Sequence, residues 1–369
     1  MRIAFLDPTN LDYTVETPEQ RPLGGSQSAL SYLAVEIAAL GHSVSVINNT
    51  SKPGHYRGVN CAHFGFGLSP VILNGFDVVV VLNQALGTAL QQKYRVNAPL
   101  VLWTGDAHNE PALRPLGDPR ERAAWRGFAF VSDWQLATYE RAYDIPPDRS
   151  RVMRNAISPS FAALEPPQPW FACGEAPVLV YTSTPFRGLD VLLRAFPAIR
   201  SGIRGARLRV FSSMAIYQIP SAHDQYAKLY RQCTTTKGVE YVGPVGQHEL
   251  ANEVAGAAAL AYPSTFAETS CIAALEAMAA GALVLTTSLG ALPETTGGFA
   301  QMIELPADRA QLTKDYARMA VRALTELQRD PDAASVRRQE QIAYVRQNYT
   351  WPARAPEWIS WLSGLAGSG

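Results

Sequence analysis

Hydrophobic and polar positions in the first part of the chain follow the periods of strands and helices in turn. An apolar run over residues 2–7 is followed by a polar loop, and residues 28–42 then carry leucine and isoleucine at helical spacing. Residues 43–48 predict the next strand, and apolar runs typical of strands buried on both faces lie at residues 77–83, 99–105 and 129–133. Strands that alternate with helices predict a doubly wound parallel sheet.

The pattern breaks at Ser158–Pro177, which is dense in proline and has no clean period, so we interpret it as an interdomain linker. The alternation then starts again. Strands are expected at residues 178–183, 207–213, 239–245, 258–264 and 282–288, with helices at 189–199, 248–257 and within 266–285. Two α/β halves predict a two-lobed protein. Because ligands of such sheets bind at the carboxyl ends of strands, a cleft between the lobes is expected.

These patterns predict four segments along the chain. They are a domain at residues 1–160, a linker at 161–177, a second domain at 178–345 and a helical tail at 346–369. The tail carries three tryptophans, Trp351, Trp358 and Trp361. We expect it to form an amphipathic helix that packs back on the body, with a role at a membrane surface as the alternative.

Composition narrows the class of protein. The 369 residues are enough for about two domains, and 47% hydrophobic with 17% charged residues supports a sizeable core. Lys+Arg and Asp+Glu both number 32, so nothing indicates a nucleic-acid binder with a basic surface. The four cysteines are far apart and indicate reduced thiols in a cytoplasmic protein, not a zinc site: Cys61, Cys173, Cys233 and Cys271. The opening MRIAFLDPTN predicts a strand, not a signal peptide.

The segment FAETSCIAALEAMAAGALVL, at residues 266–285, keeps Glu268 and Glu276 among apolar and small residues. Glu268 is expected in a strand-to-helix loop with Thr269 or Ser270 as the N-cap, and Glu276 in the second helical turn. A helix N-terminus exposes unpaired N–H groups and suits a phosphate. Carboxylates on either side of it could accept hydrogen bonds from the hydroxyls of a sugar nucleotide. The alternative is a helix-starting acid plus a solvent-facing one.

The longer stretch YPSTFAETSCIAALEAMAAGALVLTTSLGALPE resembles the E-x7-E segment of retaining glycosyltransferases of the GT-B fold, the family-4 type (glycosyl transferases group 1). The resemblance includes the LEAMA-G core and, after the next strand, Gly290 and Glu294. It implies two Rossmann-like doubly wound domains that face an interdomain cleft. It also implies that Glu268 contacts the donor sugar and Glu276 the ribose. The family's E-P-F-G differs here, and the backbone amides of the replacing residues are expected at the donor: Thr269, Ser270 and Cys271.

The stretch VLVYTSTPFRGLDVLLRAFP, at residues 178–197, resembles the first strand, loop and helix of the family's donor domain, where an Arg and a Lys clamp the diphosphate. Arg187 occupies the Lys position before Gly188. A guanidinium at the head of a helix can bind phosphate oxygens and stabilise a leaving group. The earlier Arg is missing, and the hydroxyls of Ser183 and Thr184 are expected to take part of its role. The alternative is an ordinary loop arginine.

The stretch EYVGPVGQHELANEVAGAAALAYPS, at residues 240–264, is similar to the family's strand-G-x-v segment. The backbone of its turn would hold the base at Val242, Gly243 and Val245. The run FVSDWQLATYERAYDIPPDRSRVMRNAISPSF, at residues 130–161, resembles the segment that closes the family's first lobe, and its residues are expected to be structural.

Two stretches of the first domain also match the family. PLGGSQ corresponds to its glycine-rich loop, so Gly24 and Gly25 are expected near the donor phosphates or the acceptor, at a helix N-terminus. Asp106 and His108 follow a buried strand and match the region of an acidic or histidine contact to the transferred sugar. A plain loop and a buried structural histidine are the alternatives. The G-x-G-x-x-G fingerprint is absent, so NAD is not expected.

The resemblance implies transfer with retention of configuration through a front-face displacement, with no protein nucleophile, metal or other cofactor. No D-x-D motif follows a strand, and Asp330-Pro331-Asp332 is expected to form a surface turn. The expected partners are a nucleotide sugar as donor and a glycan, lipid-linked intermediate or small metabolite as acceptor, without nucleic acid. A lipid-linked acceptor would imply weak association of a cytoplasmic protein with the inner membrane face.

Other classes of function stay open at this point. One is a catalytically weak or inactive partner subunit that binds a sugar nucleotide without turnover, which the missing Arg favours. Another is a protein–protein scaffold, which would not need Arg187, Glu268 and Glu276 together. A sugar phosphorylase or epimerase on the same fold is a further alternative.

Overall fold

The chain divides into two compact units, residues 1–156 with 350–369 and residues 157–349. The computed structural model describes residues 1–367, so the last two residues of the expected tail lie outside the described residues. Unit 1 is built on an eight-stranded sheet in the order β3-β4-β2-β1-β5-β6-β7-β8. Its strands are β1 (Arg2–Leu6), β2 (Ser43–Asn48), β3 (Gly54–Tyr56), β4 (Val59–His63), β5 (Val78–Leu82), β6 (Leu100–Thr104), β7 (Gly127–Phe130) and β8 (Ser150–Val152).

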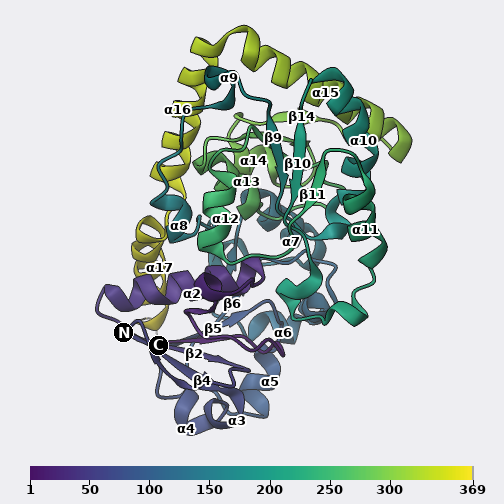
Figure 1. Ribbon diagram of the computed structural model, residues 1–369. Coiled ribbons are helices and arrows are strands. Elements are labelled where there is room, and N and C mark those ends of the chain that lie inside the picture. Colours follow the sequence, from purple (N-terminus) through teal and green to yellow (C-terminus); the bar gives the residue numbers. More distant parts are fainter. Residues whose placement is uncertain (368–369) are drawn as a thin grey trace. The chain divides into compact units, whose positions relative to one another are not determined.

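Neighbouring strands of this sheet run parallel, except that the edge strand β3 is antiparallel to β4. The helices of unit 1 are α1 (Thr17–Gln20), α2 (Gly25–Ala39), α3 (Phe64–Gly67), α4 (Pro70–Leu73), α5 (Gly87–Gln92), α6 (Pro119–Ala123), α7 (Asp133–Tyr143) and α17 (Trp351–Ala366). Although α17 ends the chain, it packs against α2 near its beginning, and Figure 1 shows the yellow helix beside the purple one.

Unit 2 is built on a six-stranded, wholly parallel sheet in the order β11-β10-β9-β12-β13-β14. Its strands are β9 (Val178–Tyr181), β10 (Arg207–Val210), β11 (Val239–Tyr241), β12 (Ala259–Ala261), β13 (Leu283–Thr287) and β14 (Gln301–Ile303). Its helices are α8 (Pro159–Ala162), α9 (Trp170–Cys173), α10 (Leu189–Gly202), α11 (Ala227–Thr235), α12 (Gln247–Val254), α13 (Ile272–Ala279), α14 (Leu292–Thr296), α15 (Arg309–Arg329) and α16 (Pro331–Asn348).

The two sheets, which are parallel except at the edge strand β3, confirm the predicted α/β class. Strand β5 is buried along its whole length, as expected for a continuous apolar run that is covered on both faces. In unit 2, α10 packs against α15 and α13 against α16, so helices from both ends of the unit contribute to one core. Many observed strands are shorter than the apolar runs that predicted them, because the last residues of each run already belong to the loop at its carboxyl end.

The segment interpreted as a linker is part of unit 2. Phe161 on α8 and Trp170 on α9 are buried in the unit 2 core, so the boundary lies before residue 157 and the expected linker at 161–177 is wrong. Prolines in this segment start short helices, with Pro159 as the first residue of α8. At the other end, unit 2 extends to residue 349, and the returning tail begins at residue 350.

The late polar segment is almost wholly helical. Helices α15 and α16 follow each other directly, and Asp330 lies at their junction, where its side chain accepts a hydrogen bond from Ala333 N at 3.1 Å. The expected surface turn at Asp330-Pro331-Asp332 is therefore a helix boundary, with Asp330 as the N-cap and Pro331 as the first helical residue.

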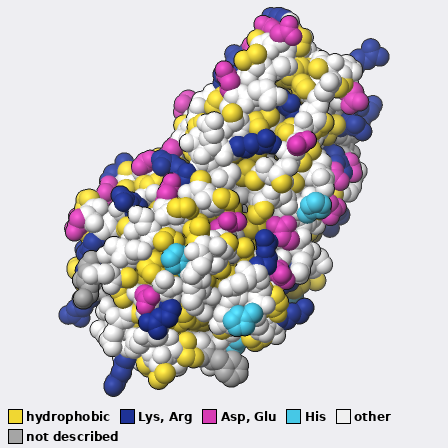
Figure 2. Space-filling view, turned by 90° about the vertical axis from the view of Figure 1, so that its left-hand side faces the viewer, with side chains coloured by type: hydrophobic (Ala, Val, Ile, Leu, Met, Phe, Trp, Pro, Cys, Tyr) yellow, Lys and Arg dark blue, Asp and Glu magenta, His cyan; other side chains and the backbone are white. Residues whose placement is uncertain are grey.

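Charged side chains of both signs are mixed on the surface of the protein. Figure 2 shows positive and negative side chains interspersed over the face it draws, in keeping with the equal numbers of acidic and basic residues.

Within residues 1–367 no helix has the length and apolarity to cross a membrane. The same residues contain no group of three or more His, Cys, Asp and Glu side chains suited to hold a metal ion.

Candidate functional site

An ion pair lies at the carboxyl edge of the unit 2 sheet. Strands β9 and β12 are parallel neighbours, so the loops that follow them leave the sheet at the same edge. The first loop carries Arg187 and the second carries Glu268. The Nη1 of Arg187 donates to Oε1 of Glu268 at 2.8 Å and to Oε2 at 2.9 Å. Arg187 and Glu268, both predicted from the sequence to bind the donor, thus contact each other.

Two glycines let the loops approach this closely. Gly188 follows Arg187 with a φ of +117°, and a Cβ there would lie 2.1 Å from the carbonyl oxygen of Pro263. Gly290 has a φ of +67°, and a Cβ there would lie 2.4 Å from the carbonyl oxygen of Glu268. Both the backbone conformation and the close contact therefore require glycine. The backbone of Glu268 is further fixed because its carbonyl accepts from Ala291 N at 2.7 Å.

The carboxylate of Glu268 is buried and firmly oriented. Its side chain is 3% exposed, and the buried hydroxyl of Tyr262 donates to its Oε1. Burial raises the pKa of Tyr262 well above its usual range, and the Glu268 charge raises it further, so the hydroxyl stays a donor. Tyr262 was not among the predicted site residues. The signal for it was its place at the end of an apolar run, directly before the Pro-Ser of the motif.

The guanidinium of Arg187 lies between two aromatic rings and the carboxylate. Its Cζ is 4.6 Å from the ring centroid of Phe266 and 5.6 Å from that of Phe186. Burial, the largest single effect, would lower the pKa of Arg187, but Glu268 together with Tyr262, Tyr217 and Cys271 outweighs burial and raises it. Arg187 is therefore a permanent cation, and its flat faces are held by rings that do not compete for its N–H groups.

Two polar atoms beside this pair are buried without a hydrogen-bond partner among the described residues. They are the Nε of Arg187 and the Oγ1 of Thr184. A buried polar group without a partner costs roughly 1–3 kcal/mol, so such groups require an explanation. Both atoms belong to the loop between β9 and α10, where an anion would find an N–H and a hydroxyl donor together. Ser183, the other predicted hydroxyl, is half-buried, and its carbonyl accepts from Ser212 Oγ at 2.6 Å.

Glu276 lies on α13 and is buried, at 5% exposure, so the alternative of a solvent-facing acid is wrong. Its Oε1 accepts from the backbone N of Ser158 at 3.4 Å. Helix α13 begins later than expected. Its N-cap is Cys271, whose side chain makes no capping hydrogen bond, and Thr269 and Ser270 lie before the helix. Burial raises the pKa of the Cys271 thiol, which keeps the thiol neutral.

The turn predicted to hold a base follows β11 at the same edge of the sheet. The backbone N–H groups of Val242 and Gly243 both donate to the carbonyl of Val210, at 3.0 and 3.2 Å, and Gly243 has a φ of +87°. Val245, two residues further on, is half-buried. The hydroxyl of Tyr241 donates to Ser212 O at 2.9 Å, which ties the turn to the end of β10. The turn is thus anchored beside the loop of Ser183 and Thr184.

The remaining predicted residues belong to unit 1. Gly24 is the N-cap of α2 and Gly25 its first residue. Asp106 and His108 follow β6, where the carbonyl of Asp106 accepts from Tyr139 Oη at 3.0 Å. The hydroxyl of Tyr143 donates to the carbonyl of His108. Both side chains are half-buried, so His108 is not the fully buried histidine of the alternative interpretation.

The two predicted stretches of unit 1 lie next to each other. A Cβ on Gly105, the residue before Asp106, would lie 3.4 Å from Oγ of Ser26 at the start of α2. Gly24 has a φ of −60°, so its backbone conformation does not require glycine. The structure brings the predicted residues of unit 2 together at one edge of the unit 2 sheet. The predicted residues of unit 1 lie together at an edge of the unit 1 sheet.

Comparisons with known proteins concern the family and the fold. Residues 176–323 match the model of the family "Glycosyl transferases group 1". A curated relative, D-inositol 3-phosphate glycosyltransferase from Streptomyces scabiei, is 28% identical over 308 residues. That alignment covers 77% of this chain and 65% of the relative, so the chain spans less than two thirds of the relative's length.

Solved structures show the same fold over the whole chain. Sucrose-phosphate synthase from Thermosynechococcus elongatus aligns with a TM-score of 0.72 at 15% identity and covers 100% of both chains. HepE from Anabaena, solved in complex with UDP, aligns with a TM-score of 0.66 at 14% identity, over 99% of this chain and 100% of that one.

The fold is that of GT-B glycosyltransferases. The residues that match the glycosyl transferases group 1 family, 176–323, lie within unit 2.

Proposed function

We propose that this protein transfers a sugar from a nucleotide-diphosphate sugar to a hydroxyl group of an acceptor. The observation that carries this proposal is the Arg187–Glu268 pair with two unpartnered buried atoms beside it, Arg187 Nε and Thr184 Oγ1. A diphosphate supplies the acceptors that both atoms lack, and a sugar supplies hydroxyl donors for a fixed carboxylate.

Each residue of the unit 2 site has a role in this proposal. Arg187 binds the diphosphate and stabilises the charge that develops as it leaves, with Ser183 and Thr184 as hydroxyl partners. Glu268 accepts a hydrogen bond from a sugar hydroxyl. For this, part of the Arg187 guanidinium turns from the Glu268 carboxylate to the phosphate. Glu276 accepts from the ribose hydroxyls, and the turn at residues 242–245 holds the base through its backbone.

The proposed reaction is a front-face displacement with retention of configuration, of the family-4 type. The bond from the anomeric carbon to the diphosphate oxygen breaks, and the bond to the acceptor oxygen forms on the same face. The acceptor proton passes to the departing phosphate oxygen, so no protein nucleophile and no metal is needed. In unit 1, Asp106 and His108 are proposed contacts to the transferred sugar, and Gly24 and Gly25 contacts to phosphate or acceptor.

The names of the relatives suggest where to start with donors and acceptors. HepE was solved with UDP-glucose, and the curated relative is named for an inositol phosphate acceptor. We propose a uridine diphosphate sugar as the first donor to test and a glycan, a lipid-linked intermediate or a polyol metabolite as acceptor. A lipid-linked acceptor would bring the protein to the inner face of the membrane.

Turnover tests the proposal against that of an inactive partner subunit. The full chain would be incubated with a bound donor and a panel of acceptors in the presence of a chelator. Nucleoside diphosphate release would be followed, and the product's anomeric configuration determined by NMR. Release that depends on acceptor, with retained configuration, supports the proposal. A donor that binds but never turns over with any acceptor favours the partner subunit.

A further inference from the structure

Helix α7 presents a row of three polar side chains on one face. Gln135, Tyr139 and Tyr143 are spaced four residues apart, so they follow one another along the same side of the helix. This side contacts the loop that follows β6 and carries Asp106 and His108. The sequence predicted only a structural role for the helix, and the contacts with this loop suggest more.

Gln135 ties the end of β6 to the loop after it. Its side chain is buried, and its Nε2 donates to Thr104 O at 3.1 Å and to Asp106 O at 2.8 Å. Its Oε1 accepts from Val131 N at 2.7 Å, so both ends of the amide group have partners. The orientation of the amide is therefore fixed, and the two carbonyls that it binds are fixed with it.

Tyr139 and Tyr143 continue this row of donors. The hydroxyl of Tyr139 donates to Asp106 O at 3.0 Å, and the hydroxyl of Tyr143 donates to His108 O. Burial raises the pKa of both tyrosines above their usual range, so the hydroxyls stay protonated and remain donors. These hydrogen bonds hold the backbone of the loop and do not engage the side chains of Asp106 and His108.

The N–H groups of the same loop are bound as well. Gly105 N donates to Asn83 Oδ1 at 2.8 Å, and Asp106 N donates to Thr104 Oγ1 at 3.1 Å. Asn83 follows β5 with a φ of +55°, a conformation that asparagine adopts more readily than most residues. The loop is thus fixed through its carbonyls by α7 and through its N–H groups by the ends of β5 and β6.

The ring of His108 packs against the rings of both tyrosines. Its centroid lies 6.4 Å from that of Tyr139 and 6.5 Å from that of Tyr143, with interplanar angles of 79° and 69°. Such edge-to-face contacts are favourable and restrict the orientation of the ring. His108 is half-buried, so part of it stays open to solvent and to a ligand.

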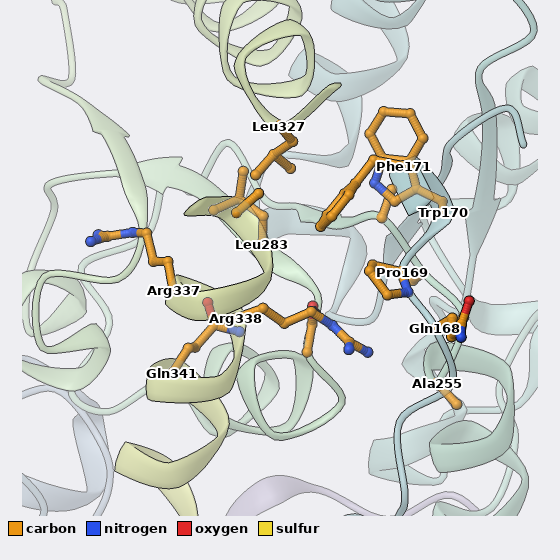
Figure 3. Close-up of a pocket in the computed structure, with 15 residues that line it drawn as sticks. Gln168, Pro169, Trp170, Phe171, Ala255, Leu283, Leu327, Arg337, Arg338 and Gln341 are labelled. Carbon is orange, nitrogen blue, oxygen red and sulfur yellow. Dashed lines mark hydrogen bonds between the residues drawn. The ribbon is translucent and has the colours of Figure 1, made fainter. Parts of the chain in front are cut away.

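A similar glutamine in unit 2 shows what such bonds do where no predicted site residue takes part. Gln341 of α16, drawn in Figure 3, is buried, and its Nε2 donates to Met278 O at 3.0 Å and to Ala282 O at 3.1 Å. This bridge joins the end of α13 to the start of β13. Bonds to carbonyls alone therefore indicate only a structural role. In unit 1, however, the bound carbonyls belong to a loop at the carboxyl end of a parallel strand, where ligands of such sheets bind.

We propose that Gln135, Tyr139 and Tyr143 are positioning residues, which fix the loop of Asp106 and His108 and the ring of His108 in the orientation that meets the transferred sugar. The proposal rests on the proposed function, in which both residues of the loop contact that sugar. Groups that are held in place before the substrate binds lose less freedom in the transition state, and small displacements of them are costly in rate.

Histidine NMR on the full chain without ligand tests the positioning itself. Tyr143→Phe removes the hydroxyl and keeps the ring, whereas Tyr143→Leu removes both. The ring-proton signals of His108, assigned with His108→Gln, should move in Tyr143→Phe and move further in Tyr143→Leu. Tyr56→Phe on the edge strand β3 is the matched control, because Tyr56 is also half-buried in unit 1 and its hydroxyl donates to Lys52 O at 3.1 Å. It should leave the His108 signals unchanged.

Kinetics test whether the positioning matters for transfer. With a donor and acceptor that turn over, Tyr143→Phe should lower kcat about fivefold, as for the loss of one hydrogen bond that holds a reacting group in place. Affinity for UDP should stay the same, since the nucleotide is proposed to bind unit 2. Tyr56→Phe should keep both values. A bond with a structural role alone would change the unfolding temperature and leave kcat of the folded protein unchanged.

Two results would overturn the proposal. His108 signals in Tyr143→Phe that match those of the unaltered chain would mean that the hydroxyl does not set the loop. Signals that move while kcat stays the same would mean that the loop is held without consequence for transfer. Failure of the unaltered chain to turn over any donor contradicts the proposed function instead, and the NMR comparison then still decides whether α7 positions the loop.

Discussion

The central residue of the site is Glu268, a carboxylate whose orientation is set by others. Tyr262 and Arg187 both donate to its Oε1, and Arg187 also donates to Oε2. A buried charge is tolerated only when it is paired and hydrogen-bonded, and here both conditions hold. The sequence motif indicated Glu268 and Arg187 separately. It could not show that they bind each other, because that contact depends on two loops brought together by the pairing of β9 with β12.

Tyr262→Phe should lower both stability and donor affinity. The change keeps the buried ring and removes one hydrogen bond to a charged acceptor, which costs about 1.5–3 kcal/mol. Glu268 then loses part of its fixed orientation, so donor binding weakens as well. Tyr316→Phe is the control, since Tyr316 is equally buried and its hydroxyl donates to Leu285 O at 3.0 Å in the core. Urea unfolding and donor titration measure the two effects. Equal donor affinity in the two variants would contradict the positioning role of Tyr262.

The cysteines should differ in reactivity by their environments. Burial raises the pKa of Cys61 and Cys271, and it raises that of Cys233 to about 11, whereas Cys173 is exposed. Thiolates are the reactive form, so a raised pKa keeps a thiol protonated and unreactive at neutral and mildly alkaline pH. Iodoacetamide at pH 8 should modify Cys173 first, as read by peptide mass spectrometry. Early modification of Cys271 would show that its loop opens.

Because the folded pKa of these thiols exceeds the unfolded value, the unfolded state loses protons first as the pH rises. Their contribution to stability is therefore present below about pH 9 and declines as the pH rises above it.

At the scale of elements, apolar runs of strand length predicted the positions of most strands, because strands covered on both faces show in the sequence as continuous apolar segments. Such patterns cannot show whether a proline-rich stretch packs into the core of a domain. Residues 161–177 were assigned to a linker, yet Trp170 belongs to the core. The N-cap of α13 was also misplaced: Thr269 and Ser270 are good capping residues, yet the helix starts at Ile272 with Cys271 as its N-cap.

The loops at the sheet edge need glycine where their backbones approach each other closely. A pair of glycine variants tests this. Gly290→Ala and Gly298→Ala both place a Cβ on a backbone with positive φ, at +67° and +83°. At Gly298 nothing lies within 4 Å of that Cβ, whereas at Gly290 it meets Glu268 O at 2.4 Å. Gly298→Ala should cost about 1 kcal/mol for conformation alone, and Gly290→Ala clearly more. Urea unfolding measures both. Equal costs would mean that the loop relaxes and that the contact with Glu268 is not rigid.

At the scale of the whole molecule, the C-terminal helix completes the N-terminal unit. Trp351 and Trp358 on α17 are buried, and Trp358 lies 5.0 Å from Trp103 of β6 between ring centroids. The sequence predicted a tail helix that packs on the body from its tryptophans. It could not tell which unit receives the helix, since hydrophobic spacing carries no information about the partner.

Trp358→Ala should destabilise unit 1. A buried aromatic replaced by alanine leaves a cavity and typically costs about 3–5 kcal/mol. We expect a lower unfolding midpoint for unit 1, detected by hydrogen exchange in the peptides of β5 and β6, with unit 2 peptides unchanged. Faster exchange in both units alike would mean that the two fold as one cooperative body, and unchanged exchange would mean that α17 is dispensable.

The central claim is that Arg187 and its neighbours bind a nucleotide-diphosphate sugar. Calorimetric titration of the full chain with UDP-, GDP-, dTDP- and ADP-sugars, with a chelator present, tests it most directly. Arg187→Gln and Glu276→Gln would be compared with Arg194→Gln, an exposed arginine on α10 that pairs with Asp190. The account predicts selective binding of one nucleotide class, weakened at least tenfold by each of the first two changes and unaltered by the third. Binding of no sugar nucleotide, or equal binding by Arg187→Gln, would contradict it.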